Sequence, residues 1–293
     1  MNLILTVLEV VAPVFLLATI GFAWVKLGFE YRIQFVTQMS MTLALPCLIF
    51  VSLMKTTIDS KSLSTVFAAS VIAYLLVTVA MFVWVRTTQL DLRTYLAPFI
   101  FGNTGNLGLP LALFAFGEQG LGYAVVIFAA MAIYSFTVGV WLVSGGGSLL
   151  RVVQEPIVAA TLLGGLFWSQ GWQTPLFLTN TLDLVGQMAI PLMLITLGVS
   201  VARLSLRHFG RAIWMSILKV AICAAIATGV GMVFQLSDVA FGVLVLQLAM
   251  PVAVTNYLLA EKYGADAEAV AGLCVMSTLA SIITIPLILA FVI

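Results

Sequence analysis

The chain has 293 residues, of which 63% are hydrophobic and 8% charged, and it carries a formal net charge of +1 at pH 7. A soluble domain has about 25% charged residues, so this chain has too few to cover a surface that faces water. The composition predicts an all-α integral membrane protein and excludes a soluble enzyme. The net charge says nothing about nucleic acid, but the sequence has no basic patch, so no nucleic-acid partner is expected.

Ten apolar segments are interpreted as membrane spans, because a transmembrane helix needs about 20 mainly apolar residues. The first begins at Leu3, lacks a basic leader and is longer than the apolar core of a cleavable signal. The sixth is the shortest, since its unbroken apolar run extends only from Ile157 to Trp168. The predicted spans are residues 3–25, 33–54, 63–85, 94–116, 120–143, 152–168, 182–202, 209–234, 239–260 and 267–292.

The positions of lysine and arginine predict the orientation, since cytoplasmic loops carry an excess of both. Of the 12, nine lie in loops that follow odd-numbered spans, two lie on the opposite side, and Lys219 lies inside span 8. We therefore expect a multi-pass protein of the cell inner membrane, with the odd-numbered loops in the cytoplasm and both termini on the non-cytoplasmic side. The nine are Lys26, Arg32, Arg86, Arg93, Arg151, Arg203, Arg207, Arg211 and Lys262, and the two are Lys55 and Lys61.

The two halves of the chain resemble each other. Residues 13–21 match residues 156–164 at an offset of 143, and Pro46 matches Pro191 at an offset of 145. Each repeat would hold five spans, an odd number, so the second copy enters the membrane from the opposite side. We predict two inverted repeats of five transmembrane helices, residues 1–145 and 146–293, in one membrane domain.

Spans 4 and 9 are each interrupted by residues that break helices. Residues 102–110 contain three glycines, two asparagines and Pro110, and residues 247–256 contain Pro251 and an asparagine. Proline removes a backbone N–H and clashes with the preceding turn. Unwound backbone at membrane depth is tolerated only where protein buries it or water solvates it. Matched breaks in both halves therefore indicate the binding site of a transporter.

If the two breaks cross at the midplane, four half-helix ends face one point, and the N-terminal ends offer N–H groups that suit a carboxylate. Neighbouring asparagine and threonine side chains would add neutral donors and acceptors. They could instead only cap the broken helices, and capping and binding are compatible. The predicted substrate-binding residues are Asn103, Thr104, Asn106, Pro110, Pro251, Thr255 and Asn256.

Two ionisable residues lie inside predicted spans, where a charge without a partner is costly. Glu9, about two turns into span 1, is a candidate for proton coupling. An outer vestibule and a packing role are the alternatives for it. Lys219, about two to three turns into span 8, either extends its amine to the interface or acts as a cation at the unwound backbone or the substrate.

The sequence contains no pattern typical of a metal site or an active site. Cys47, Cys223 and Cys274 share no short spacing, and His208 is the only histidine, so neither a disulfide framework nor a metal site is expected. We also find no nucleophile elbow, no zincin motif and no paired intramembrane aspartates, and therefore expect no enzyme. No cofactor is expected, although Na⁺ or H⁺ is a candidate coupling ion.

The interrupted spans resemble motifs of the auxin efflux carrier family. Its bacterial members include malonate-transporter-like permeases, and the plant PIN auxin exporters are distant relatives. Residues 102–111 resemble the fourth-span motif. Residues 250–264, with Met-Pro, a following Asn and then Ala-Glu-x-Tyr-Gly, resemble the ninth-span motif. Residues 13–21 also fit, so the resemblance extends over essentially the whole chain.

This resemblance implies a ten-span fold of the bile-acid-symporter and antiporter type. Broken helices 4 and 9 would cross in a transport domain of helices 3–5 and 8–10, which moves against a scaffold of helices 1, 2, 6 and 7. It also implies homodimers formed through the scaffold, and an organic anion with its carboxylate at the crossing. The chain lacks the long central loop of the large plant carriers, so a compact prokaryotic permease is expected.

Together these observations predict a secondary transporter that moves a small mono- or dicarboxylate by alternating access. The alternative is a sodium- or proton-coupled carrier of a non-anionic solute on the same fold, since asparagines and helix ends also bind neutral solutes. A sensor built on a transporter scaffold is a further class, but it is expected to carry an added soluble domain, which these 293 residues do not contain.

Overall fold

The computed structural model describes residues 3–144, 156–203 and 209–293, and every regular element within these ranges is a helix. Seven helical segments are long and apolar enough to cross a membrane. Together with the apolar composition they indicate a multi-pass membrane protein. The predicted repeat boundary at residues 145 and 146, the predicted cytoplasmic residues Arg151 and Arg207, and His208 lie outside the described residues.

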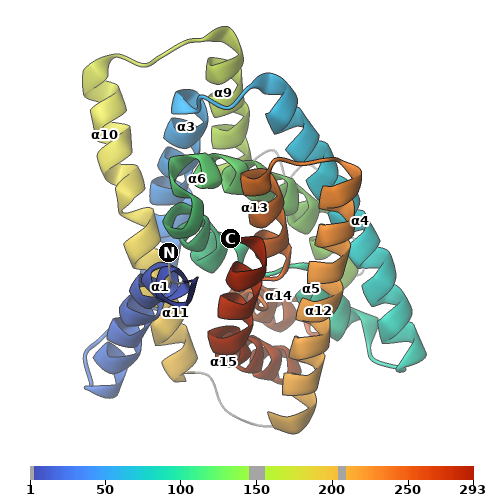
Figure 1. Cartoon of the computed structure of the whole chain (residues 1–293). Coiled ribbons are helices and arrows are strands. Elements are labelled where there is room, and N and C mark those ends of the chain that lie inside the picture. Colours follow the sequence, from blue (N-terminus) through green and yellow to red (C-terminus); the bar gives the residue numbers. More distant parts are fainter. Residues whose placement is uncertain (1–2, 145–155, 204–208) are drawn as a thin grey trace.

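Figure 1 shows the arrangement of the helices. In chain order they are α1 (Leu3–Lys26), α2 (Ile33–Met39), the π-helix η1 (Ser40–Ala44), α3 (Leu45–Lys55), α4 (Ser60–Thr87), α5 (Leu92–Ile100), the π-helix η2 (Thr104–Gly108), α6 (Leu109–Tyr134), the π-helix η3 (Ser135–Gly139), α7 (Val140–Ser144), α9 (Pro156–Gln170), α10 (Leu176–Gln187), α11 (Ala189–Arg203), α12 (Phe209–Val233), α13 (Asp238–Leu248), α14 (Val254–Tyr263) and α15 (Ala267–Val292).

Each of the ten predicted spans contains helix, yet seven segments rather than ten meet the length for a span. Three features account for the difference. First, α9 has 15 residues and is short. Second, α13 and α14 are separate halves of predicted span 9. Third, residues 104–143 are one continuous helical segment that covers parts of predicted spans 4 and 5, with a kink at Gly117 (φ 63°, ψ −158°).

The helices form two groups by their packing. In the first group α1 packs along α11, and α3 packs along both α9 and α10. In the second group α12 packs against α4, α13 and α15, while α6 packs against α4 and α13. Figure 1 shows α10 and α11 on the left and α4 and α12 on the right. The groups meet where α6 contacts α1, α3 and α9, and where α15 contacts α1.

Two glycines bring the backbones of α1 and α11 into direct contact. A Cβ atom added to Gly21 would lie 2.0 Å from Ile195 O, and one added to Gly198 would lie 1.7 Å from Ala18 O. Small residues at such positions allow membrane helices to approach closely and to gain dispersion contacts that lipid does not provide. This contact is the main junction within the first group of helices.

The residues that match between the two halves occupy matching places in the fold. Gly21 of α1 lies against α11, and Gly164 of α9 lies against α3, where an added Cβ would be 3.0 Å from Leu53 Cβ. α1 therefore packs on α11, and α9 packs on α3. Pro46 and Pro191 both stand in the first turn of a helix, α3 and α11, where proline is tolerated.

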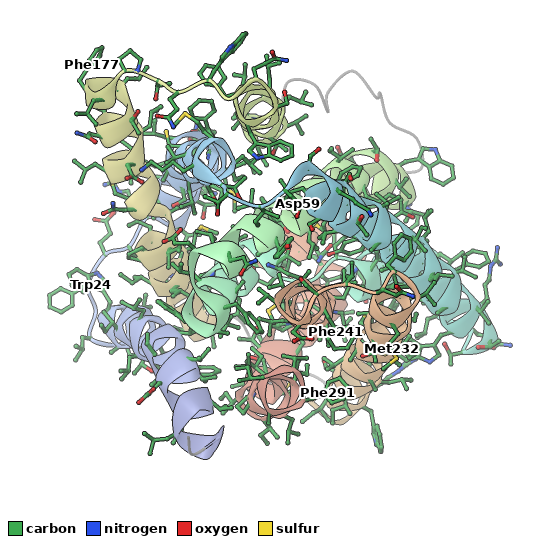
Figure 2. The ribbon with its side chains drawn as sticks, turned by 45° about the horizontal axis from the view of Figure 1, so that its top comes forward. Trp24, Asp59, Phe177, Met232, Phe241 and Phe291 are labelled. Carbon is green, nitrogen blue, oxygen red and sulfur yellow. The ribbon has the colours of Figure 1, made fainter. Side chains whose placement is uncertain are left out.

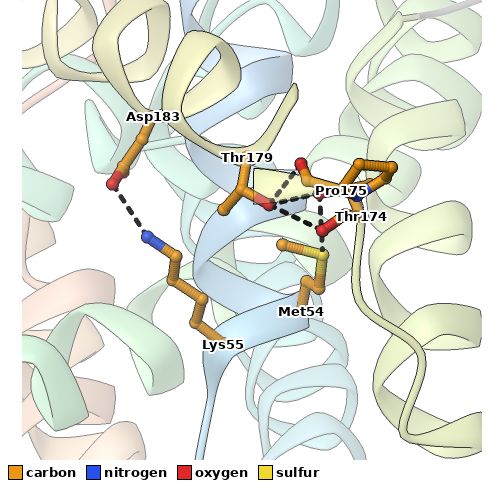
Figure 3. A network of polar contacts seen from close by, with 6 residues as sticks. All are labelled: Met54, Lys55, Thr174, Pro175, Thr179 and Asp183. Carbon is orange, nitrogen blue, oxygen red and sulfur yellow. Dashed lines mark hydrogen bonds and ion pairs between the residues drawn. The ribbon is translucent and has the colours of Figure 1, made fainter. Parts of the chain in front are cut away.

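Polar contacts join the ends of α3 and α10 (Figure 3). Lys55 Nζ lies 2.8 Å from Asp183 Oδ2, and Thr174 Oγ1, just before α10, lies 3.7 Å from Met54 Sδ of α3 and 2.6 Å from Thr179 Oγ1. The side chains of Lys55 and Asp183 are 49% and 40% exposed. An ion pair this exposed contributes about 0–1 kcal/mol, so apolar packing supplies most of the stability here.

The outer surface of the bundle is apolar. Phe177 is 75% exposed, Met232 64% and Phe291 62%. Figure 2 shows these side chains, with Trp24, on the outside of the helices. Apolar patches of this extent are unusual on a soluble monomer, but in a bilayer they contact lipid.

We expect Gly198→Ala to destabilise the α1–α11 contact, because the new Cβ would meet the backbone of Ala18 at 1.7 Å. Overpacking costs about 1–3 kcal/mol, and a backbone atom cannot turn aside as a flexible side chain does. The thermal midpoint of the detergent-purified protein should fall by several degrees. In the control Gly229→Ala, the new Cβ has nothing within 4 Å, and the midpoint should stay or rise. Equal midpoints for Gly198→Ala and wild type would contradict this packing.

Candidate functional site: two broken helices in contact

Two interruptions of the helices lie against each other. One covers residues 101–103 between α5 and η2, and the other covers residues 249–253 between α13 and α14. Gly102 and Val252 form an antiparallel bridge across the two interruptions. We call residues 101–103 and 249–253 together the crossing.

The two segments of the crossing form hydrogen bonds with each other's backbone groups. Asn103 N donates to Pro251 O at 2.6 Å, and Ala253 N donates to Phe101 O at 3.4 Å. A buried peptide group without a partner is costly, and each break has lost its helical hydrogen bonds. Pairing between the breaks therefore replaces bonds that neither helix makes alone.

The structure places the first break upstream of Pro110, which was predicted to cause it. Pro251 lies in the second break, but Pro110 lies in the first turn of α6, after η2. The wider π-helical turn of η2 directly precedes Pro110 and accommodates its missing N–H and its ring. The backbone unwinds further upstream, at residues 101–103, where the partner segment offers replacement hydrogen bonds.

Asn256 stabilises the crossing through its side-chain amide. Its side chain is 3% exposed, and Nδ2 donates to Phe101 O at 2.9 Å and to Ala253 O at 3.1 Å. Both amide hydrogens are thus used by the backbone, as in the capping interpretation of the sequence. Ser277 of α15 adds a further link, because its Oγ accepts from Val252 N at 2.9 Å. This role could not be read from the sequence, since Ser277 is one of several hydroxyl residues in an apolar helix.

Four polar side chains beside the crossing have buried atoms without a hydrogen-bond partner. These atoms are Asn103 Nδ2, Thr104 Oγ1, Asn106 Oδ1 and both amide atoms of Gln247, and they make up five of the seven such atoms among the described residues. The side chain of Gln247 packs against η2, since a Cβ added to Gly108 would lie 2.3 Å from Gln247 Oε1. An unpartnered buried polar group costs about 1–3 kcal/mol, so this concentration indicates room for a polar ligand or water.

Gln247 is the one member of this set that was not predicted as a binding residue. It is fully buried, at 0% exposed, near the C-terminal end of α13. Its polarity within an apolar span is visible in the sequence, where interhelical hydrogen bonding is the usual role of such a residue. The structure gives its amide group no such bond within the described residues.

The crossing combines helix ends of both polarities. η2 and α14 begin here, so their first amide groups have no intrahelical partner and carry partial positive charge. α5 and α13 end here, and their last carbonyl groups carry partial negative charge. Asn103, Thr104 and Asn106 stand at the beginning of η2, on the positive side. Met250 follows the end of α13, on the negative side.

Lys219 of α12 reaches the negative side. Its side chain is fully buried, at 0% exposed, and Nζ donates a hydrogen bond to Met250 O. A Cβ on Gly102 would lie 3.3 Å from Nζ, so the amine is next to both breaks. The interpretation that this amine extends to the membrane interface is therefore wrong.

Glu9 and Thr255 are exposed, unlike the other predicted site residues. Glu9 is exposed on α1, which belongs to the first group of helices. Thr255 is exposed in the first turn of α14, directly before the buried Asn256. Neither side chain takes part in the hydrogen bonds that connect the crossing among the described residues.

A cavity of about 260 Å³ lies among α5, α12 and α15, apart from the crossing. Arg211, Asp266 and Glu268 are among its lining residues, and none of the predicted substrate-binding residues lines it. Its charged lining at the helix ends contrasts with the buried neutral amides of the crossing. Within the described ranges, no three His, Cys, Asp or Glu side chains are arranged to hold a metal ion.

Comparison with known proteins gives one family. The sequence profile described as "Membrane transport protein" matches residues 6–148 and 142–289. An uncharacterized transporter of Methanothermobacter thermautotrophicus is 30% identical over 95% of this chain and 96% of its own. An uncharacterized transporter of Methanocaldococcus jannaschii is 28% identical over 64% of each chain. A Rhizobium meliloti protein named provisionally as a malonate transporter is 24% identical, over 83% of this chain and 82% of its own.

We expect Asn256→Ala to lower the stability of the folded protein, because the buried carbonyl groups of Phe101 and Ala253 would each lose a donor. The loss should be about 1–3 kcal/mol, measured as a lower thermal midpoint in detergent. Thr255→Ala is the matched control, since this neighbouring side chain is exposed, and its midpoint should match that of the wild type. Equal midpoints for the wild type, Asn256→Ala and Thr255→Ala would show that the Asn256 side chain does not stabilise the crossing.

Proposed function

This chain belongs to the membrane transport protein family, that of the auxin efflux carriers, and we propose that it is a secondary transporter which carries a small organic anion by alternating access. The observation that carries this proposal is the set of unpartnered buried polar atoms at the crossing. A transporter needs a buried polar site that its substrate completes, and these atoms provide one.

The chemistry of the positive side favours a carboxylate. Asn103 Nδ2 is a free donor, and the first amide groups of η2 lie beside it. Such groups at a helix start attract anions. Malonate, after which the Rhizobium meliloti relative is named, is a dicarboxylate, and that name supports the same substrate class.

Some of the free atoms also favour a second candidate substrate. Asn106 Oδ1 and Gln247 Oε1 are acceptors, and a carboxylate offers them no proton. A carboxylate that also bears hydroxyl or N–H groups would use both kinds of atom. A neutral polar solute, coupled to sodium or protons, would use the acceptors without needing the positive helix ends, and it remains the alternative.

The packing of the helices supports alternating access. The unpartnered atoms are buried, so a substrate reaches them only after a movement that opens the crossing. A Cβ on Gly105 of η2 would lie 3.6 Å from Met193 Cε of α11, so the crossing borders the first group of helices. We propose that α1–α3 and α9–α11 are the scaffold, and that α4–α7 and α12–α15 move against it as one body.

The same proposal includes ten membrane crossings in two inverted repeats, residues 1–145 and 146–293. Gly117 and Gly264 follow the two breaks at matching places, and both have positive φ, 63° and 69°. The antiparallel bridge between Gly102 and Val252 is the pairing expected about a two-fold axis in the membrane plane.

We further propose that both termini lie on the non-cytoplasmic side of the inner membrane and that two copies associate through the scaffold. The orientation rests on the lysine and arginine distribution. The homodimer rests on the family resemblance. Cysteine labelling from outside intact cells at either terminus tests the first, and mass measurement in detergent tests the second.

The test of the substrate class is thermal stability of the purified protein against a panel of mono- and dicarboxylates and neutral polar solutes. A ligand of the folded state present at 100 times its Kd stabilises by about 2.7 kcal/mol. One class of carboxylate should raise the midpoint, and Asn106→Ala should lose that shift and the matching uptake into liposomes. Asn180→Ala, an exposed asparagine on α10, is the matched control and should keep both.

A shift with neutral solutes and with no carboxylate would reject the organic anion and select the alternative substrate. A carboxylate shift that survives Asn106→Ala would place the anion elsewhere, and the charged cavity beside Arg211 would be examined by the same assay.

A further inference from the structure

Lys219 is a buried cation in the middle of an apolar helix. It lies in α12, which extends from Phe209 to Val233 and contains a candidate membrane span. Ser216 and Cys223, one turn before and after it, are each 1% exposed, so this face of α12 is turned inward. An ammonium group in such surroundings needs compensating partners, because burial removes its hydration.

The hydrogen-bond partner of this amine is a backbone carbonyl group rather than a carboxylate. Nζ donates to Met250 O, and neither ion pair found among the described residues includes Lys219. Met250 lies two residues after the last residue of α13, and the end of α5 meets this segment across the Gly102–Val252 bridge. Two helix C-terminal ends, each with partial negative charge, therefore converge where the amine lies.

Because Gly102 has no side chain, the Lys219 amine has space beside it. A Cβ at this position would lie 3.0 Å from Met250 O and 3.3 Å from Lys219 Nζ. The crossing thus brings together an unwound carbonyl group, two negative helix ends and a space for a cation. In transporters with broken helices, this combination of unwound carbonyls and helix C-terminal ends coordinates sodium.

We propose that Lys219 is a built-in cation that takes the place of a bound sodium ion at the crossing. Its amine permanently compensates the partial negative charge of the carbonyl groups on the negative side, so the crossing is stable without sodium. It also puts a fixed positive charge beside the site that would receive the anion. This last consequence rests on the proposed function, whereas the replacement of sodium stands on the geometry of Lys219, Met250 and Gly102 alone.

The test compares the thermal midpoint of the detergent-purified full chain in sodium chloride and in choline chloride at equal ionic strength. The wild type should have the same midpoint in both salts. Lys219→Ala should have a lower midpoint in choline chloride and recover part of the loss as sodium rises, with saturation. Methylammonium, a free analogue of the missing amine, should also restore stability to this variant.

Two variants control for the loss of a buried side chain. Cys223→Ala removes a side chain of similar burial on the same face of α12, and its midpoint should not depend on sodium. Lys219→Arg keeps a cation and should also remain independent of sodium. If Lys219→Ala yields folded protein only when purified in sodium, that salt-dependent yield serves as the readout and supports the proposal.

Two results would overturn the proposal. One is a saturable rise of the wild-type midpoint with sodium, which would show that the crossing still binds this ion beside Lys219. The other is a Lys219→Ala protein whose midpoint or folded yield responds neither to sodium nor to methylammonium, which would make Lys219 a packing residue. Neither result depends on the substrate, so the absence of any carboxylate shift in the wild type would reject the organic anion and leave this inference intact.

Discussion

The need to satisfy backbone polar groups away from water governs this structure. Most of the chain meets it with helices, whose hydrogen bonds are internal. Residues 101–103 and 249–253 leave helical geometry and need other partners. They find them in each other, in the side chain of Asn256 and in α12 and α15, which supply Lys219 and Ser277. The second group of helices is therefore assembled around the crossing, and α12, α14 and α15 each contribute a side chain to its hydrogen bonds.

The first group of helices is held together in a different way. Glycine contacts bring α1 against α11 and α9 against α3, so dispersion between closely packed helices stabilises these two contacts. A junction of this kind does not depend on the polar atoms of the crossing. The two groups therefore differ in the interactions that stabilise them, and the contact of η2 with α11 lies where they meet.

The polarity of the crossing follows from the direction of its four helices. The starts of η2 and α14 offer N–H groups, and the unpartnered amides Asn103 and Asn106 stand at one of these starts. The ends of α5 and α13 offer carbonyl groups, and the amine of Lys219 lies there. One small region thus presents a side suited to an anion and a side suited to a cation.

The sequence by itself determined the membrane class, the apolar segments that form helices, the two interrupted spans and the family, because apolar runs and breaks rich in Gly, Pro and Asn act locally. It also selected Asn103, Thr104 and Asn106 as candidate binding residues, and the structure leaves a buried polar atom of each without a partner. Only the tertiary structure decided that Pro110 lies within a helix and that the side chain of Asn256 donates to backbone carbonyl groups. It also decided that the amide group of Gln247 is buried without a partner, and that Lys219 donates to Met250, 31 residues away. The physical reason is that a hydrogen bond depends on which distant segments meet, and spacing along one helix carries no record of those partners.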